Sequence, residues 1–179
     1  ASTYSSLEYN FDQKARGHRN THVEKLICEL LDVEAAIVVN NNAAGVMLVL
    51  SALARNREVI VSRGELVEIG GSFRIPEIME ESRAILRGVG TTNRTHLHDY
   101  ERVLNDETAA LLRVHTSNFR LIGFTKSVST KELADLAHKH NLPLIYDLGS
   151  GCLSPQLAAL LTGEPTIASA IADDVDVIC

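Results

Sequence analysis

Short apolar runs alternate with segments of helical periodicity along most of this chain. The runs that we interpret as strands are Ala35–Val39, Glu58–Val61, 84–89, 109–114, Leu142–Tyr146 and Val175–Ile178. The expected helices cover 22–32, 43–54, a short segment opened by Pro76, 99–104, a segment capped by Ser129 or Thr130 that runs to about His140, 155–161 and 166–172. This alternation predicts an α/β fold with a mostly parallel sheet and helices on both faces.

Asp147 directly follows the apolar run Leu142–Tyr146 and precedes Leu148-Gly149-Ser150-Gly151. In open α/β sheets, ligands bind at the carboxyl ends of strands. A carboxylate at such a place can pair with the protonated ring nitrogen of a bound cofactor. The alternative is a loop or helix-capping aspartate, and this segment taken alone favours neither.

The second candidate is the turn Asn40-Asn41-Asn42-Ala43-Ala44-Gly45, between an expected strand and an expected helix. Small side chains, free N–H groups and the helix dipole suit a phosphate group there. An ordinary Asn-capped helix start is the alternative. The chain contains neither a Walker motif nor a G-x-G-x-x-G sequence after a strand.

Three further loops follow expected strands and have functional and structural interpretations. Arg63–Pro76 is rich in glycine and charge, and is either a functional loop or a solvated surface loop. Gly90–Thr95 carries hydroxyl, amide and guanidinium groups that suit an oxyanion or a subunit contact, or it is a simple turn. In Val114–Arg120, His115 and Asn118 could contact a planar ring, or His115 could be structural.

Composition narrows the class of protein. With 179 residues, 45% of them hydrophobic, the chain can form one domain with a sizeable core, and it has no apolar run long enough for a membrane span. A net charge of −6 argues against a dominant nucleic-acid surface, although Arg16, His18 and Arg19 cluster near the start. Three widely spaced cysteines suggest a reducing, cytoplasmic setting. The pairs His96/His98 and His138/His140 lack accompanying ligands, so we expect no metal site.

Several segments together resemble bacterial selenocysteine synthases, the L-seryl-tRNA(Sec) selenium transferases. They are RGELVEIGGSFRIP (Arg63–Pro76), GTTNRT (Gly90–Thr95), VVNNNAA (Val38–Ala44), HTSNFR (His115–Arg120), DLGSG (Asp147–Gly151) and the early RGHR (Arg16–Arg19) followed by His22-Val23-Glu24. The resemblance covers essentially the whole chain. It implies the large domain of a fold-type I, aspartate-aminotransferase-like enzyme with pyridoxal phosphate as cofactor.

The same resemblance implies a reaction and a set of residues. Serine on tRNA(Sec) would pass through an aminoacrylyl intermediate, and selenophosphate would then give selenocysteinyl-tRNA(Sec) in a cytoplasmic homodecamer without membrane attachment. By this resemblance, Asn41, Asn42, Ala43 and Ala44 would bind the cofactor phosphate, and Asp147 would pair with the pyridinium nitrogen. His115 and Asn118 would contact the ring, and Arg19 would bind the selenium donor. Thr91 and Thr92 would lie at contacts between dimers.

The chain departs from the complete pattern of that family. Members carry a Schiff-base lysine shortly after a strand like Val175–Ile178, and this chain ends at Cys179. We therefore expect residues 1–179 to be a partial, inactive large domain that lacks the N-terminal tRNA-binding domain and the C-terminal small domain. Two alternatives stay open: another fold-type I pyridoxal-phosphate lyase acting on a small amino acid, or a non-catalytic oligomerisation or phosphate-binding module.

Overall fold

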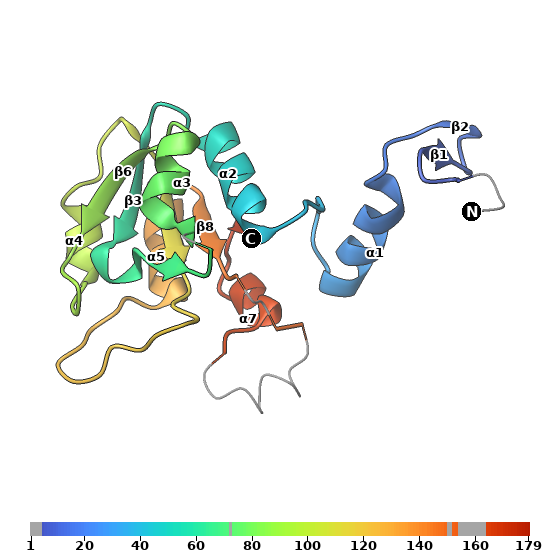
Figure 1. Ribbon diagram of the computed structural model, residues 1–179. Helices are drawn as coiled ribbons and strands as arrows, with labels where there is room; N and C mark the ends of the chain where they lie inside the picture. The colour runs from blue at the N-terminus through green and yellow to red at the C-terminus, as the bar shows by residue number, and fades with distance from the viewer. Residues whose placement is uncertain (1–4, 72, 150–151, 154–163) are drawn as a thin grey trace. The chain divides into compact units, whose positions relative to one another are not determined.

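The computed structural model describes residues 5–71, 73–149, 152–153 and 164–179. The chain forms two compact units, Ala1–Asn40 and Asn41–Cys179, which we call unit 1 and unit 2. Figure 1 shows the elements of both. No helix in the described ranges is long and apolar enough to cross a membrane.

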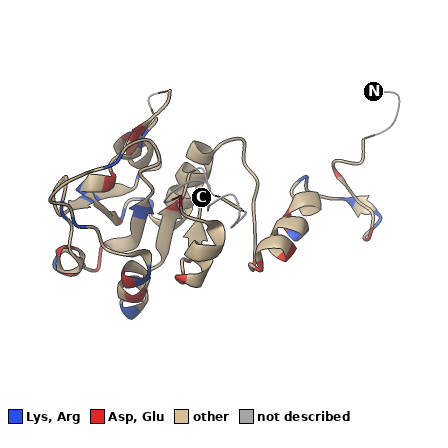
Figure 2. Ribbon diagram, turned by 90° about the horizontal axis from the view of Figure 1, so that it is seen from below, with Lys and Arg blue, Asp and Glu red and all other residues tan. Residues whose placement is uncertain are grey.

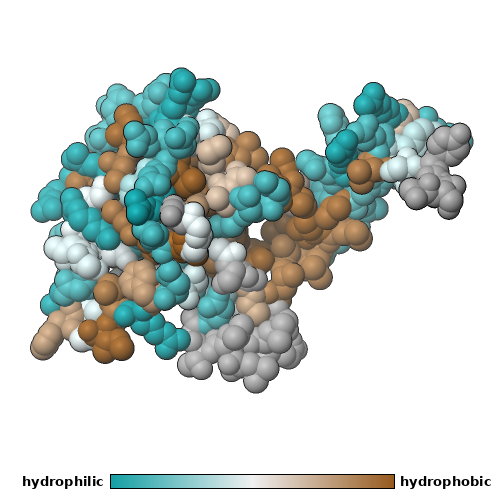
Figure 3. All heavy atoms as spheres, in the orientation of Figure 1, coloured by the Kyte–Doolittle hydropathy of each residue, from teal (hydrophilic) through white to brown (hydrophobic). Residues whose placement is uncertain are grey.

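Unit 1 contains a small hairpin and one helix. Strands β1 (Tyr9–Asn10) and β2 (Ala15–Arg16) pair antiparallel, and α1 spans Thr21–Leu31. The helix agrees with the expected segment 22–32. The two strands were not predicted, because a two-residue strand is too short to show an alternation of apolar and polar residues. No residue of α1 is buried, and its apolar side chains form part of the brown surface over unit 1 in Figure 3.

The expected strand Ala35–Val39 is wrong. These residues have no regular secondary structure, and Ile37 is 60% exposed. A strand forms only where a neighbouring strand satisfies its backbone N–H and C=O groups, and no strand pairs with this segment among the described residues. An apolar run alone does not report whether such a neighbour exists.

Unit 2 is built on a five-stranded sheet with the order β6-β3-β7-β8-β9, in which every neighbouring pair is parallel. The strands are β3 (Glu58–Ser62), β6 (Ile85–Val89), β7 (Thr108–Val114), β8 (Leu144–Asp147) and β9 (Val177–Ile178). The predicted parallel α/β sheet is therefore confirmed. Because all five strands run the same way, their carboxyl ends meet at one edge, where ligands bind in such sheets.

Helices cover both faces of this sheet, as predicted. Helices α2 (Asn42–Leu53) and α3 (Ile75–Glu81) pack on one face, and α4 (Leu97–Glu101) and α5 (Thr130–Lys139) on the other. Successive side chains of β7 point to opposite faces of the sheet, so the core has two layers. Ala110 and Leu112 belong to the layer under α2 and α3, whereas Leu111 belongs to the layer under α4 and α5. Both layers are visible in Figure 1.

Several boundaries differ from the expected ones. Helix α4 begins at Leu97, two residues early, because Asp99 accepts a hydrogen bond from the His96 backbone N–H and forms a capping box. Strand β8 includes Asp147 as its last residue, and β9 is shorter than expected. The loop 63–76 holds a 3₁₀ helix (Arg63–Glu65) and a hairpin of β4 (Glu68–Ile69) with β5 (Phe73–Arg74). Helix α7 (Ile167–Ala172) matches the expected helix 166–172, whereas 155–161 and Ser150-Gly151 lie outside the described residues.

The amino end of α5 gives a first testable prediction. The Ser129 hydroxyl accepts a hydrogen bond from the Glu132 backbone N–H, so Ser129 and not Thr130 is the cap. Replacing Ser129 by alanine should lower the free energy of unfolding by about 1 kcal/mol, because an N–H of the first turn loses its partner. Urea denaturation measures this change. The matched control is Ser127→Ala, at an exposed serine outside the helix, which should change the stability by less than about 0.5 kcal/mol.

Candidate active site

Asp147 lies at the carboxyl end of β8, between the ends of β7 and β9. Its carboxylate is almost completely buried, with 3% of the residue exposed. Asn42 Nδ2 donates a hydrogen bond to Asp147 Oδ1 at 2.7 Å, and the His115 backbone N–H donates to the Asp147 carbonyl at 2.9 Å. Burial raises the pKa of Asp147, while the bonds from Asn42 and the Gly149 backbone and the nearby His115 act in the opposite direction.

The amino end of α2 meets the end of β8 at this point. Asn41 caps the helix, because its side-chain oxygen accepts a hydrogen bond from the Ala44 N–H at 2.9 Å. Within the described part of the chain, no hydrogen bond occupies the backbone N–H groups of Asn42 and Ala43. These groups, together with the positive end of the helix dipole, form a place for an anion near the buried Asp147 carboxylate.

His115 is held beside this site by a partner that the sequence did not reveal. It directly follows β7, and its Nε2 lies 3.3 Å from Glu164 Oε2, with both side chains about four-fifths buried. Glu164 thereby orients the imidazole ring. The two residues are 49 positions apart, and no local pattern marks Glu164 as a member of the site.

Glu65 is a second residue that sequence reasoning missed. It belongs to the 3₁₀ helix after β3, and its Oε2 accepts a hydrogen bond from the Val114 backbone N–H at 3.0 Å. Burial raises the pKa of Glu65, and the Arg113 charge and the Val114 bond oppose this shift. Glu65 thus fixes the backbone immediately before His115. Arg113 in turn lies over the Tyr146 ring at 5.5 Å and donates to the Val128 carbonyl.

Other expected site residues lie elsewhere. Asn118 is exposed, and its side chain donates to the Glu68 carbonyl at 2.8 Å, so it binds β4 and not Asp147. Thr91 and Thr92 lie exposed on the loop after β6. Arg19 belongs to unit 1, where its guanidinium donates twice to Glu8 Oε1, at 2.9 and 2.6 Å.

The histidine pairs form other contacts. His96 and His98 stack with ring centroids 5.3 Å apart, and His138 Nε2 lies 2.9 Å from Asp176 Oδ2. Throughout the described ranges, no group of three or more His, Cys, Asp or Glu side chains could hold a metal ion. The groups around Asp147, His115 and the start of α2 lie together at the carboxyl ends of β7 and β8.

Comparison with known proteins shows which family the sequence matches. The model of the family described as L-seryl-tRNA selenium transferase matches residues 1–179. Among curated proteins, the chain is 60% identical over 175 residues to the L-seryl-tRNA(Sec) selenium transferase of Maridesulfovibrio salexigens and 56% identical over 178 residues to that of Clostridium perfringens. These matches cover 98% and 99% of this chain but 38% of each relative, so the chain spans well under half of their length.

Solved structures agree on the fold. D-Glucosaminate-6-phosphate ammonia-lyase superposes with a TM-score of 0.72 over 93% of this chain and 45% of that protein, at 20% identity. The O-acetylhomoserine sulfhydrylase of Wolinella succinogenes gives a TM-score of 0.55 over 72% of this chain and 34% of that protein, at 18% identity. These superpositions confirm the expected fold class, a mostly parallel sheet flanked by helices.

Proposed function

Because this chain belongs to the L-seryl-tRNA selenium transferase family, we propose that the full-length protein replaces the serine hydroxyl of seryl-tRNA(Sec) by selenium from selenophosphate. Pyridoxal phosphate is the proposed cofactor. In this proposal residues 1–179 supply part of the large cofactor-binding domain, and the tRNA contacts come from a separate domain of the full-length protein.

The observation that best supports the proposal is the buried carboxylate of Asp147. Its carboxylate is buried, yet no ion pair joins it to a lysine or arginine among the described residues. A buried carboxylate with a raised pKa is stabilised in its charged form by a cation, and a protonated pyridine nitrogen is such a cation. The free N–H groups of Asn42 and Ala43 suit the phosphate group of the same molecule. The residues present therefore fit pyridoxal phosphate.

When bound, pyridoxal phosphate supplies an electron sink for a carbanion at the α-carbon of an amino acid. The contribution of this chain is to bind and orient. Asp147 holds the proton on the ring nitrogen, and Asn42 fixes the carboxylate that does so. His115, held by Glu164, lies next to Asp147 along the sheet edge and limits where a planar ring can lie.

The proposal also assigns roles to residues outside the Asp147 cluster. Arg19 binds the anionic selenium donor, which would take the place of the Glu8 carboxylate on its guanidinium. Asn118 contacts the ring after leaving its bond to the Glu68 carbonyl. Thr91 and Thr92 form contacts between dimers of a cytoplasmic homodecamer.

The cofactor is tested with the full-length protein. Adding pyridoxal phosphate should produce a visible absorbance band that sodium borohydride abolishes, because the bound cofactor forms a reducible bond to the protein. The protein should also bind serylated tRNA(Sec) more tightly than other seryl-tRNAs. Without a reducible band the proposed enzyme class is wrong, whereas a band together with equal binding of all seryl-tRNAs contradicts only the proposed substrate.

A further inference from the structure

Strand β7 stays paired further along on its β8 side than on its β3 side. Its pairing with β8 runs to Val114, opposite Asp147, and the His115 N–H still donates to the Asp147 carbonyl. Its pairing with β3 ends two residues earlier, where Leu112 lies opposite Val61. The N–H groups of alternate residues in a parallel strand point to opposite neighbours. The Val114 N–H therefore faces the β3 side at a point where the pairing with β3 has already ended.

The side chain of Glu65 takes the place of the missing strand. Its Oε2 accepts the Val114 N–H at 3.0 Å, which is an ordinary length for a hydrogen bond of a sheet. Val114 is buried, so water cannot readily replace this acceptor. Glu65 thus fixes the strand at the residue before His115, and His115 lies next to Asp147 along the sheet edge.

The carboxylate of Glu65 serves no ion pair. Acidic and basic residues are mixed along the ribbon of unit 2 (Figure 2), and the ion pairs of Arg74 and Lys131 join exposed side chains. Glu65 is partly buried and takes part in none of the ion pairs within the described part of the chain. The charge of Arg113 acts on Glu65, but its guanidinium donates to the Val128 carbonyl at 2.6 Å. The contact that Glu65 makes with β7 is therefore the bond to its backbone.

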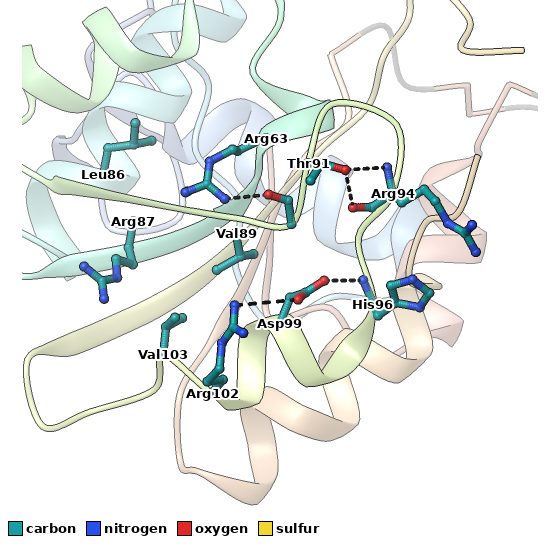
Figure 4. A pocket seen from close by; sticks show the side chains of 12 residues that line it. Arg63, Leu86, Arg87, Val89, Thr91, Arg94, His96, Asp99, Arg102 and Val103 are labelled. Carbon is teal, nitrogen blue, oxygen red and sulfur yellow. Dashed lines mark hydrogen bonds and ion pairs between the residues drawn. The ribbon is translucent and has the colours of Figure 1, made fainter. Parts of the chain in front are cut away.

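The 3₁₀ helix that carries Glu65 is also fixed to β6, the neighbour of β3 on its other side. Arg63 Nη1 donates to the Gly90 carbonyl, just after β6, at 2.5 Å (Figure 4). An added Cβ at Gly64 would lie 2.7 Å from the Thr92 carbonyl oxygen, so glycine is needed for this close approach. The helix bridges the strands on both sides of β3, and the fold itself sets the place of the Glu65 carboxylate.

We propose that Glu65 is a positioning residue of the proposed reaction: by holding the Val114 N–H, it sets the backbone from which His115 meets a planar cofactor. This inference rests on the proposed function. His115 is oriented at two points, at its ring by Glu164 and at its backbone by Glu65. A small displacement of such a contact changes how well a bound group is oriented. Because Glu65 acts through His115, removing its oxygen should have little further effect once the His115 imidazole is gone.

Two substitutions of similar length separate the hydrogen bond from the volume of the side chain. Glu65→Gln keeps an oxygen that can accept the Val114 N–H, whereas Glu65→Met offers only a weakly accepting sulfur. Hydrogen–deuterium exchange of the full-length protein should be about fivefold or more faster at Val114 in Glu65→Met and nearly unchanged in Glu65→Gln. The control is Ser82→Ala, which removes a buried 2.8 Å bond to the Met79 carbonyl before β6, at the opposite ends of the strands. It should leave exchange at Val114 unchanged.

A double-mutant cycle with His115 tests the role of Glu65 at the site. Glu65→Met should weaken binding of pyridoxal phosphate to the full-length protein by about fivefold or more when His115 is present. In the His115→Ala background it should change binding less than about twofold, because the imidazole that it positions is absent. The visible circular dichroism of the bound cofactor should change in Glu65→Met and be restored in Glu65→Gln. Ser82→Ala should change neither binding nor this spectrum.

Equal effects of Glu65→Met in the two backgrounds overturn the proposal in favour of a purely structural role. Unchanged exchange at Val114 overturns it too, and so does a Glu65→Gln protein as impaired as Glu65→Met. A wild-type protein that binds no pyridoxal phosphate contradicts the proposed function and this role with it. A wild-type protein that binds the cofactor no more tightly than Glu65→Met does contradicts this role alone.

Discussion

Replacing Asp147 by asparagine should lower kcat/KM of the full-length protein for seryl-tRNA(Sec) by about 10²-fold or more. Asparagine keeps the shape of the side chain and can still accept the hydrogen bond from Asn42. It carries no negative charge, so it cannot hold the proton on a pyridine nitrogen. Loss of one preorganised electrostatic group in an active site costs about this much.

The same substitution should stabilise the protein when the cofactor has been removed. Burial raises the pKa of Asp147 above 3.8, so the folded state binds this proton more tightly than the unfolded state does. The protonated form of Asp147 contributes stability at pH values below its pKa in the unfolded state. This contribution is lost as the pH rises through its pKa in the folded state. At neutral pH the wild-type protein therefore retains a buried charge that Asp147→Asn lacks. Thermal unfolding of the cofactor-free proteins should show the advantage of the variant growing from acidic to neutral pH.

Pyridoxal phosphate should reverse this order, because it binds the wild-type protein more tightly and stabilises it by mass action. The matched control is Asp106→Asn, at an exposed aspartate in the turn before β7, which should leave both activity and stability nearly unchanged. An Asp147→Asn protein with wild-type activity would contradict the assigned role. A variant that is inactive and less stable without cofactor would indicate a structural role for the carboxylate.

The position of Asp147 at the end of a strand could be predicted because the signal is local: an apolar run ends at a carboxylate, and strands of a parallel sheet end at one edge. The caps at Asn41 and Ser129 are local in the same sense. Glu164 and Glu65 could not be found in this way, because each contacts a residue 49 positions away. Only the folded sheet brings these partners together.

The errors have the same physical origin. Residues Ala35–Val39 have the composition of a strand, but whether a strand forms depends on a partner that the local pattern does not contain. The Gly90–Thr95 segment suggested an anion or a subunit contact from its residue types. Its position beside the 3₁₀ helix after β3 follows from β6 pairing with β3 in parallel.

Replacing Gly90 by alanine should lower the free energy of unfolding by about 2–4 kcal/mol. Its φ of +65° lies in the left-handed region. An added Cβ would overlap Thr95 Oγ1 and lie 2.8 Å from Thr95 Cβ and 2.9 Å from the Arg94 carbonyl oxygen. Thr95 cannot withdraw without cost, because its hydroxyl forms a buried 2.7 Å hydrogen bond with Ser62 and its N–H donates to Lys126.

Gly71→Ala separates the two causes of this loss. Gly71 also has a positive φ, +80°, but an added Cβ there would meet nothing within 4 Å. Gly71→Ala should therefore lower the free energy of unfolding by about 1 kcal/mol, from conformational strain alone. Urea denaturation of both variants then gives the steric contribution at Gly90 as the difference between the two losses. Equal losses would contradict a packed Gly90 turn.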